Sequence, residues 1–314
     1  GAGGFYGMGS KSEFIVESYD KEMHFKMRGE LQPKVNGDDA ELDKVIFIGG
    51  QLYVFYVDND KKTNTSKLYY QPIDKKTLAI KGTQKMLITI PYESRRTMGS
   101  FLYDISRSKN MLAIAGITGN EKSVKQKYKV IVMNSLLEKQ WEQEITLPYE
   151  SKLFSEDKAK VDEKGNLYVL GRLYQGKVAE KRGGDPNYTY KILSYREQGT
   201  VKKEYSLSLK ENFITDLGFG ITDDDHIVCG GFYSEKGTFS IKGTYFMLID
   251  ASTQEVIKQG TKAFEPDFLE LFMSEGKAEK GKELYEYDLD NLIPRSDGGA
   301  LLLAEQYFIE THTY

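Results

Sequence analysis

The chain has 314 residues, enough for one large all-β domain or two smaller ones. Its formal net charge of −4 and isoelectric point near 5.7 argue against a nucleic-acid-binding protein, which usually presents a basic face. Tyrosine (22 residues) outnumbers phenylalanine (16 residues) and suits half-buried strand faces with a wet rim, so the composition favours an all-β fold. No apolar run in the sequence reaches the length of a membrane-spanning helix.

The chain opens with a glycine-rich stretch, Gly1 to Gly7, that has neither a basic segment nor an apolar segment and therefore is not a signal peptide. It does not begin with methionine, so we expect a mature, trimmed or partial chain. Residues 13–19 and 24–30 follow as two expected strands around a tight turn. Residues 1–33 are thus predicted to be the last half of a repeated unit.

Two markers show that the sequence repeats. A strand pattern of the type Asn-Leu-Tyr-Val-Leu recurs at spacings of 60, 55, 60 and 73 residues, beginning at Gln51, Met111, Asn166, His226 and Gly299. A marker in the following strand recurs at spacings of 54, 60, 62 and 54 residues, through Asp20, Asp74, Asn134, Arg196 and Asp250. Agreement between two separate markers predicts a structural repeat of about 55–60 residues.

Each unit contains four short strands joined by turns, which is the plan of a propeller blade. The clearest unit has strands at 216–222, 227–233, 244–250 and 256–261. We therefore predict a single β-propeller domain, 1–314, of four-stranded antiparallel blades. Its complete blades are expected at 42–91, 99–149, 157–209 and 214–263. The loop between the second and third strands, 175–189 in one unit, carries the extra length and is expected on one face of the ring.

The final unit departs from this pattern. Pro266-Asp267 and the apolar residues that follow have helical spacing, which predicts a short amphipathic helix within an insert at 265–286. Residues 288–314 then supply only the first two strands of a unit. The half-units at the two ends either pair in one composite blade that closes a five-blade ring, or belong to a longer propeller of six to eight blades. We favour the longer propeller.

The sequence contains no strong catalytic motif, and it predicts no metal site and no cofactor. The three histidines, His24, His226 and His312, lie in different repeats without zinc-ligand spacing. The acidic runs at 58–60 and 223–225 do not match an EF-hand loop and are expected to be turns. Cys229, the single cysteine, lies in an apolar run and is expected to be buried and unreactive.

Two groups of residues remain as candidate sites. The first strands of propeller blades line the central channel, so polar residues there are candidates for ligand binding or acid–base chemistry: Tyr103, Asp104, Asp216 and Arg295. The predicted helix carries an apolar set that either packs on the propeller or docks a partner: Phe268, Leu271, Phe272 and Met273. Polar side chains are normal at channel mouths, and apolar helix faces usually pack against their own sheet.

Residues 280–289 (KGKELYEYDL) and 293–307 (IPRSDGGALLLAEQY) resemble a segment of uncharacterised secreted propeller-like proteins of Bacteroidota-type bacteria. The resemblance implies an extracytoplasmic location, in the periplasm or on the outer-membrane surface, and further blades beyond residue 314. It carries over no catalytic residue. The sequence therefore suggests a non-enzymatic binding or scaffold propeller that docks other cell-envelope proteins. The alternative is a carbohydrate-binding or glycan-active propeller that uses channel carboxylates and tyrosines.

Overall fold

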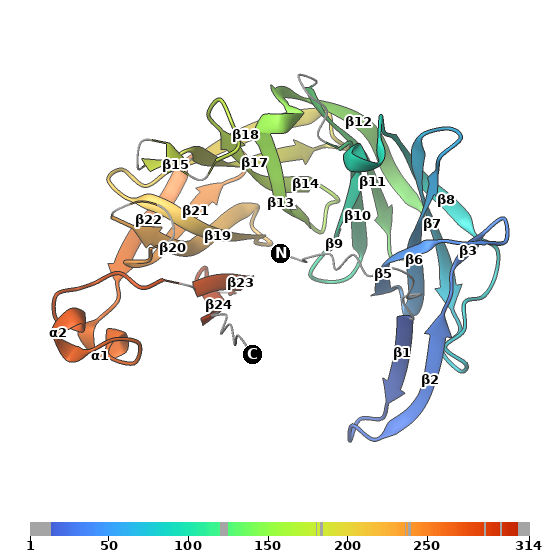
Figure 1. The fold of residues 1–314 in the computed structure, drawn as a ribbon, viewed down its shortest axis with the longest axis horizontal. Helices are drawn as coiled ribbons and strands as arrows, with labels where there is room; N and C mark the ends of the chain where they lie inside the picture. The colour runs from blue at the N-terminus through green and yellow to red at the C-terminus, as the bar shows by residue number, and fades with distance from the viewer. Residues whose placement is uncertain are drawn as a thin grey trace, which may run out of the picture. The chain divides into compact units, whose positions relative to one another are not determined.

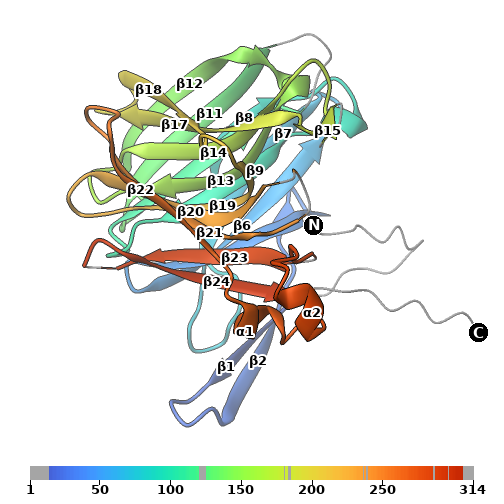
Figure 2. The ribbon, with the colours of Figure 1, turned by 90° about the vertical axis from the view of Figure 1, so that its left-hand side faces the viewer.

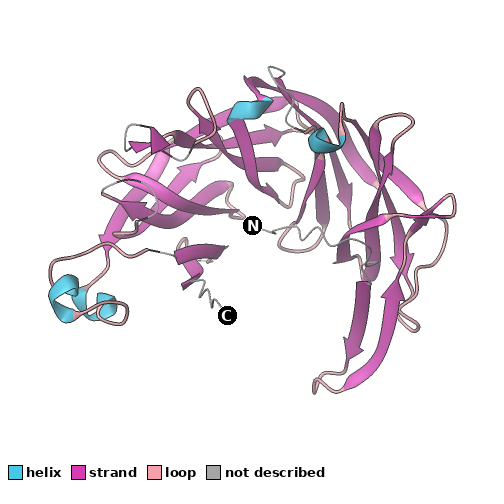
Figure 3. Cartoon of the chain, viewed as in Figure 1, coloured by secondary structure: helices cyan, strands magenta, loops and turns pink. Residues whose placement is uncertain are grey.

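The structure, a computed structural model, is all-β, and all of its paired strands run antiparallel (Figure 3). In the described residues no helix is long and apolar enough to cross a membrane. The described residues are 14–119, 125–179, 181–182, 185–235, 237, 240–285, 287–295 and 297–306.

The chain divides into two compact units. Unit 1 comprises Gly1–Phe101, Gly116–Gly119 and Ser135–Glu138, and unit 2 comprises Leu102–Ala115, Asn120–Asn134 and Lys139–Tyr314. The sheet that spans residues 100–150 falls almost entirely in unit 2.

Unit 1 contains one four-stranded sheet and two hairpins, drawn in blue and cyan in Figure 1. Val54, Tyr56 and Ile73 of the sheet pack with Leu31 and Val35 of the hairpins in one buried cluster. Unit 1 also holds a short 3₁₀ helix, η1 (Arg95–Thr97). Its strands are β1 (Phe14–Tyr19), β2 (Phe25–Leu31), β3 (Lys34–Val35), β4 (Asp38–Asp39), β5 (Glu41–Ile48), β6 (Gln51–Asp60), β7 (Thr65–Ile73) and β8 (Lys85–Pro91).

Unit 2 contains three four-stranded sheets, each built from strands that neighbour one another along the chain. The first is β9 (Ser100–Ile105), β10 (Met111–Ile117), β11 (Lys125–Asn134) and β12 (Lys139–Glu150). The second is β13 (Phe154–Val161), β14 (Leu167–Tyr174), β17 (Tyr188–Arg196) and β18 (Val201–Leu207). The third is β19 (Phe213–Ile221), β20 (His226–Ser234), β21 (Gly243–Asp250) and β22 (Val256–Ala263).

Smaller elements complete unit 2. The loop between β14 and β17 forms a small hairpin, β15 (Lys181–Arg182) and β16 (Asp185–Pro186), and the second 3₁₀ helix, η2 (Ser151–Leu153), precedes β13. The last strands, β23 (Tyr287–Pro294) and β24 (Ala300–Gln306), form a separate two-stranded sheet that runs alongside β19 and β20 (Figure 2). Gly220 allows β23 to approach closely, because a Cβ atom there would lie 2.3 Å from Pro294 Cγ.

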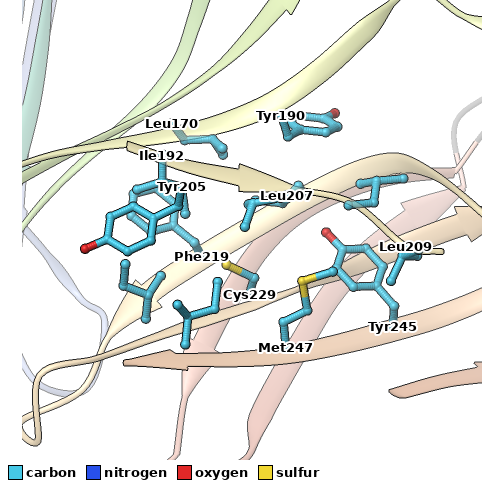
Figure 4. Packing of buried hydrophobic residues seen from close by; sticks show 14 of the residues in the cluster. Leu170, Tyr190, Ile192, Tyr205, Leu207, Leu209, Phe219, Cys229, Tyr245 and Met247 are labelled. Carbon is cyan, nitrogen blue, oxygen red and sulfur yellow. The ribbon is translucent and has the colours of Figure 1, made fainter. Parts of the chain in front are cut away.

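The core of unit 2 lies between successive sheets. Along β21 every second side chain is buried, as alternation in a strand requires. Tyr245 and Met247 of β21 pack with Phe219 of β19 against Tyr205 and Leu207 of β18 (Figure 4). The four-stranded antiparallel sheets of the sequence prediction are therefore confirmed, and the sheets that contain β18 and β19 pack face to face.

The insert differs from the predicted single amphipathic helix. It contains two one-turn helices, α1 (Pro266–Leu269) and α2 (Glu275–Ala278). The helical conformation is interrupted at Ser274, whose backbone is extended. The interruption arises because Leu269 and Ala278 are both buried in a cluster with Phe232. Packing on the sheet thus overrides helical periodicity in this segment.

In unit 2, side-chain hydrogen bonds connect successive sheets between residues that are about one repeat apart along the chain. The Glu163 carboxylate accepts a hydrogen bond from the Ser106 hydroxyl at 2.9 Å, 57 residues away. The Lys164 ammonium donates to Asp225 Oδ2 at 2.6 Å, across 61 residues. These links join the turns between the first and second strands of successive sheets.

The two end hairpins, β1–β2 and β23–β24, form separate two-stranded sheets. Their pairing in a composite blade therefore stays a prediction, as does the closure of a ring. Residues 307–314 of the predicted last half-unit, with His312, and residues 1–13 of the first lie outside the described residues.

Candidate functional site

The first strands of four sheets each carry a β-bulge at the same place. The pairing of first and second strands shifts by one residue at Asp43, Asp157, Thr215 and Asp290. A bulge leaves one residue unpaired and turns its side chain out of the regular alternation, and such bulges are common beside functional sites. The bulge residues therefore place a polar side chain near the start of each of these four first strands.

In unit 2 the bulge residue Asp157 forms a two-point ion pair with Arg172 of β14. Arg172 Nε lies 3.3 Å from Asp157 Oδ2, and Nη2 lies 3.4 Å from Oδ1. Burial raises the pKa of Asp157, and the Arg172 charge opposes this rise. The paired geometry keeps both groups in fixed positions.

Two tyrosines flank the Arg172 guanidinium, and a third packs on one of them. Its central carbon lies 5.9 Å from the Tyr174 ring centroid and 5.8 Å from that of Tyr188, within the range of cation–π attraction. Tyr188 packs edge-on against Tyr190 with ring centroids 5.5 Å apart. The Tyr188 hydroxyl donates to the Ile214 carbonyl at 3.3 Å, so the cluster joins the sheets that contain β17 and β19.

Asp216, one of the predicted channel residues, ties β19 to the last hairpin. Its Oδ2 accepts the Leu289 amide at 2.8 Å, and its Oδ1 accepts the Leu217 amide at 2.7 Å. Burial raises the pKa of Asp216, and these two amides oppose the rise. Both carboxylate oxygens are therefore engaged, Oδ2 in linking β19 to β23 and Oδ1 in accepting an amide of its own strand.

Asp104, a second predicted residue, plays the same part between β9 and β13. Its Oδ2 accepts the Val161 amide at 2.8 Å, and its Oδ1 lies 3.2 Å from Lys160 Nζ. Burial raises the pKa of Asp104, while Lys160 lowers it. Asp104 and Asp216 thus each bridge a first strand to the first strand that follows in the chain.

Glu156 adds a further carboxyl group, half-buried between two sheets. The Tyr128 hydroxyl donates to Glu156 Oε1 at 2.7 Å. Burial raises the pKa of Glu156, and the Tyr128 hydrogen bond opposes this rise only in part. A raised pKa in the folded state means that stability falls as the pH increases from the ordinary value, near 4.5, through the folded pKa.

We therefore expect the free energy of unfolding of Glu156→Gln to increase, relative to that of the native chain, as the pH rises. Glutamine keeps an oxygen that accepts from Tyr128 but does not ionise, and each unit by which the pKa is raised corresponds to about 1.4 kcal/mol. The measurement is the free energy of unfolding in urea from pH 4.5 to pH 8. The exposed Glu211→Gln is the matched control, and parallel profiles for Glu156→Gln and the native chain would contradict the prediction.

Of the other two predicted channel residues, one lies in a turn and one on β9. Arg295 is exposed and pairs with Asp297 at 2.6 Å in the turn between β23 and β24. Tyr103 is half-buried on β9. Cys229 is buried, and burial alone raises the pKa of its thiol, so the unreactive reading of this residue fits the structure.

The predicted docking residues of the insert divide into two kinds. Phe272 and Met273 are half-buried and pack on the cluster that contains Phe232. Phe268 stacks beside Phe272 with ring centroids 5.2 Å apart and remains 37% exposed. Leu271 is 73% exposed, so this side chain is the part of the insert that faces solvent.

The described part of unit 2 has several hollows, and two of them lie beside the residues discussed above. A groove of about 330 Å³ runs beside Tyr188 and Tyr190, with the segment 207–214 as its other wall. A larger groove of about 600 Å³ lies between β22 and the last hairpin, where Phe246, Gly230 and Leu302 are among its lining residues. Sequence reasoning predicted neither groove.

Asp157, Arg172 and Tyr188 were likewise not predicted from the sequence. One usable signal was present, because a polar residue recurs at the bulge position of the first strands, as Asp43, Asp157, Thr215 and Asp290. Arg172, the partner of Asp157, comes from β14, and Tyr188 comes from β17, and no local pattern brings these residues to one point.

No family model and no curated protein sequence matches the chain. Among solved structures it is similar to a protein of unknown function from Bacteroides caccae, with 11% identity over 93% of this chain and 82% of that chain, at a TM-score of 0.40. It is also similar to a variant of the Synechocystis apocarotenoid oxygenase, with 10% identity over 86% of this chain and 57% of that chain, at a TM-score of 0.40. The chain spans little more than half of the oxygenase, and we transfer no activity from it.

Proposed function

We propose that the chain is a non-enzymatic binding or scaffold propeller of the bacterial cell envelope that docks other envelope proteins. In this proposal the four-stranded sheets are blades of a β-propeller, and β1–β2 and β23–β24 are partial blades. Strand order supports the blade assignment, because each of the four larger sheets contains four strands in chain order, and the sheets that contain β18 and β19 bury faces against one another.

The observation that carries the proposal is the groove of about 600 Å³ beside the last hairpin. Its volume lies within the range of small-molecule binding sites, and its lining includes both apolar side chains and glycine residues. The adjacent strand β24 carries exposed leucines, Leu301 at 50% and Leu303 at 44%, an arrangement typical of a surface that another polypeptide covers.

Three half-buried carboxylates on first strands support a binding role over glycoside cleavage. A retaining or inverting glycosidase needs one carboxyl group free to give a proton and another free to attack or to activate water. Asp104, Asp157 and Asp216 instead engage both of their oxygens with backbone amides or cationic side chains. Carboxylates held in this way stabilise the structure and are not free to act as an acid or a nucleophile.

One observation favours carbohydrate binding as a second candidate function. Tyr188 and Tyr190 line the groove of about 330 Å³ together with Lys210, Glu211 and Asn212. Aromatic faces beside hydrogen-bonding side chains are the composition of many small-ligand sites. A glycan array probed with the purified chain separates the two functions, because the scaffold role requires no glycan signal.

We expect the native chain, isolated from a mild-detergent envelope extract after cross-linking, to carry a stoichiometric protein partner. Mass spectrometry identifies it. Leu271→Glu tests the insert as a contact, because this exposed side chain can be changed without disturbing the core, and Met23→Glu in unit 1 is an equally exposed control. Recovery of the chain without any partner, together with binding on the glycan array, would replace the scaffold proposal with the second candidate.

A further inference from the structure

Three turns of unit 2 come together around one hollow. Each turn joins the first and second strands of its sheet, and the three span residues 106–110, 162–166 and 222–225. In the middle turn, Glu163 accepts the Ser108 amide of the first turn at 2.7 Å. The Lys164 ammonium lies 2.6 Å from Asp225 Oδ2 of the third turn. The middle turn is therefore tied to both of the others.

The hollow has a volume of about 280 Å³, near the lower limit for small-molecule sites. Arg107 of the first turn lines it, together with residues 161–164, and the third turn adds Asp223 and Asp225. Val161 is buried and Ile221, which also lines the hollow, is half-buried. Apolar side chains thus lie beside charged side chains from three different turns.

Most charged groups of the hollow already have partners within the fold. The Asp162 carboxylate accepts the Lys164 amide at 2.9 Å. Asp225 pairs with both Lys164 and Arg196, at 2.6 and 3.3 Å. Both carboxylate oxygens of Glu163 accept hydrogen bonds from the first turn. These groups hold the turns in place and are not available to a ligand.

Arg107 and Asp223 differ from the other charged groups of the lining. Both side chains are exposed, and within the part of the chain that the structure describes neither forms a hydrogen bond or an ion pair. Burial raises the pKa of Glu163, but hydrogen bonds from Ser108 and Ser106 and the nearby Arg107 charge together lower it. The hollow is therefore bordered by a guanidinium from the first turn and a carboxylate from the third turn.

We propose that this hollow binds a small zwitterion, an α-amino acid with an apolar side chain. The ligand carboxylate binds the Arg107 guanidinium, whose planar fork matches a carboxylate in two parallel hydrogen bonds. The ligand ammonium binds Asp223, and the ligand side chain lies against Val161 and Ile221. The site lies outside the groove and the insert that serve the proposed docking function, so amino-acid binding is a further function of the chain.

Isothermal titration calorimetry of the purified chain with leucine, methionine and phenylalanine tests the proposal. At least one of these amino acids should bind saturably, with a Kd at or below about 1 mM. For leucine, isocaproate lacks the ammonium and isoamylamine lacks the carboxylate. Each should bind at least about tenfold more weakly than leucine, because one charge-assisted contact is lost. Absence of saturable binding for all three amino acids would overturn the proposal.

Two variants assign the charged contacts separately. Asp223→Asn should weaken leucine binding about tenfold and leave isocaproate binding unchanged, because isocaproate has no ammonium. Arg107→Gln should weaken leucine binding to a similar extent and leave isoamylamine binding unchanged. Asp224→Asn changes an exposed aspartate of the same turn that does not line the hollow, so this matched control should bind leucine normally.

The opposite responses to the two analogues separate a direct contact from a damaged fold. Asp223 and Arg107 are exposed, so circular dichroism and thermal unfolding of both variants should match those of the native chain. A distorted hollow would weaken leucine and both analogues alike, which would contradict the assigned contacts. If both variants bound leucine as tightly as the native chain, the ligand would lie elsewhere and the proposal would fall.

Discussion

Phe219→Ala is expected to lower the free energy of unfolding by about 4 kcal/mol, as large-to-small changes at buried aromatic positions do. Phe219 is 2% exposed and lies in the cluster where the sheet containing β19 packs on the sheet containing β18. Its removal leaves a cavity that rigid strands on both sides cannot close. Urea unfolding followed by tryptophan fluorescence and circular dichroism measures the loss.

Ile257→Ala is the matched control for this prediction. Ile257 is on β22 of the same four-stranded sheet but is 51% exposed, so its replacement should cost less than about 1 kcal/mol. Similar losses for the two variants would mean that burial between these sheets does not carry the stability of unit 2.

Asp216→Ala is expected to cost about 3 kcal/mol and to loosen the last hairpin. The substitution removes the acceptor of the Leu289 amide, and Leu289 is 6% exposed, so this amide loses its partner in a place that water reaches poorly. Hydrogen exchange of β23 and β24 should accelerate more than that of β19 and β20. Denaturant unfolding gives the overall loss.

Two further variants locate the cause. Asp216→Asn keeps one side-chain oxygen and should lose less stability than Asp216→Ala. The neighbouring Asp288 is exposed on β23, and its replacement by alanine should change stability by no more than about 0.5 kcal/mol. If Asp216→Ala left exchange of the last hairpin unchanged, Asp216 would not hold this hairpin in place.

The β-bulges explain where the sequence predicted the fold well and where it did not. Periodicity placed the first strand of the clearest repeat at 216–222, whereas the structure begins it at Phe213. A bulge at Thr215 interrupts the alternation of inward and outward residues in this strand. A period of two is lost at that point, so a pattern search starts the strand too late.

The sequence likewise predicted only part of the candidate site. Asp104 and Asp216 were found because they are polar residues on expected first strands, but their partners, the amides of Val161 and Leu289, lie 57 and 73 residues further along the chain. Spacing alone does not reveal which backbone group faces a given carboxylate. The predicted helix failed for a related reason, since the buried Leu269 and Ala278 are fixed by Phe232 of a distant strand.

The links between successive repeats have a consequence for how the protein folds. Hydrogen bonds such as Ser106–Glu163 and Lys164–Asp225 span 57 and 61 residues, so the loop that each must close has nearly the same length wherever it lies in the chain. The entropic cost of adding a repeat is then nearly constant, and it does not grow with the number of repeats already in place. Unit 2 should therefore assemble by stepwise growth from any folded pair of sheets, with a rate set by contacts between neighbours and not by the total length of the chain.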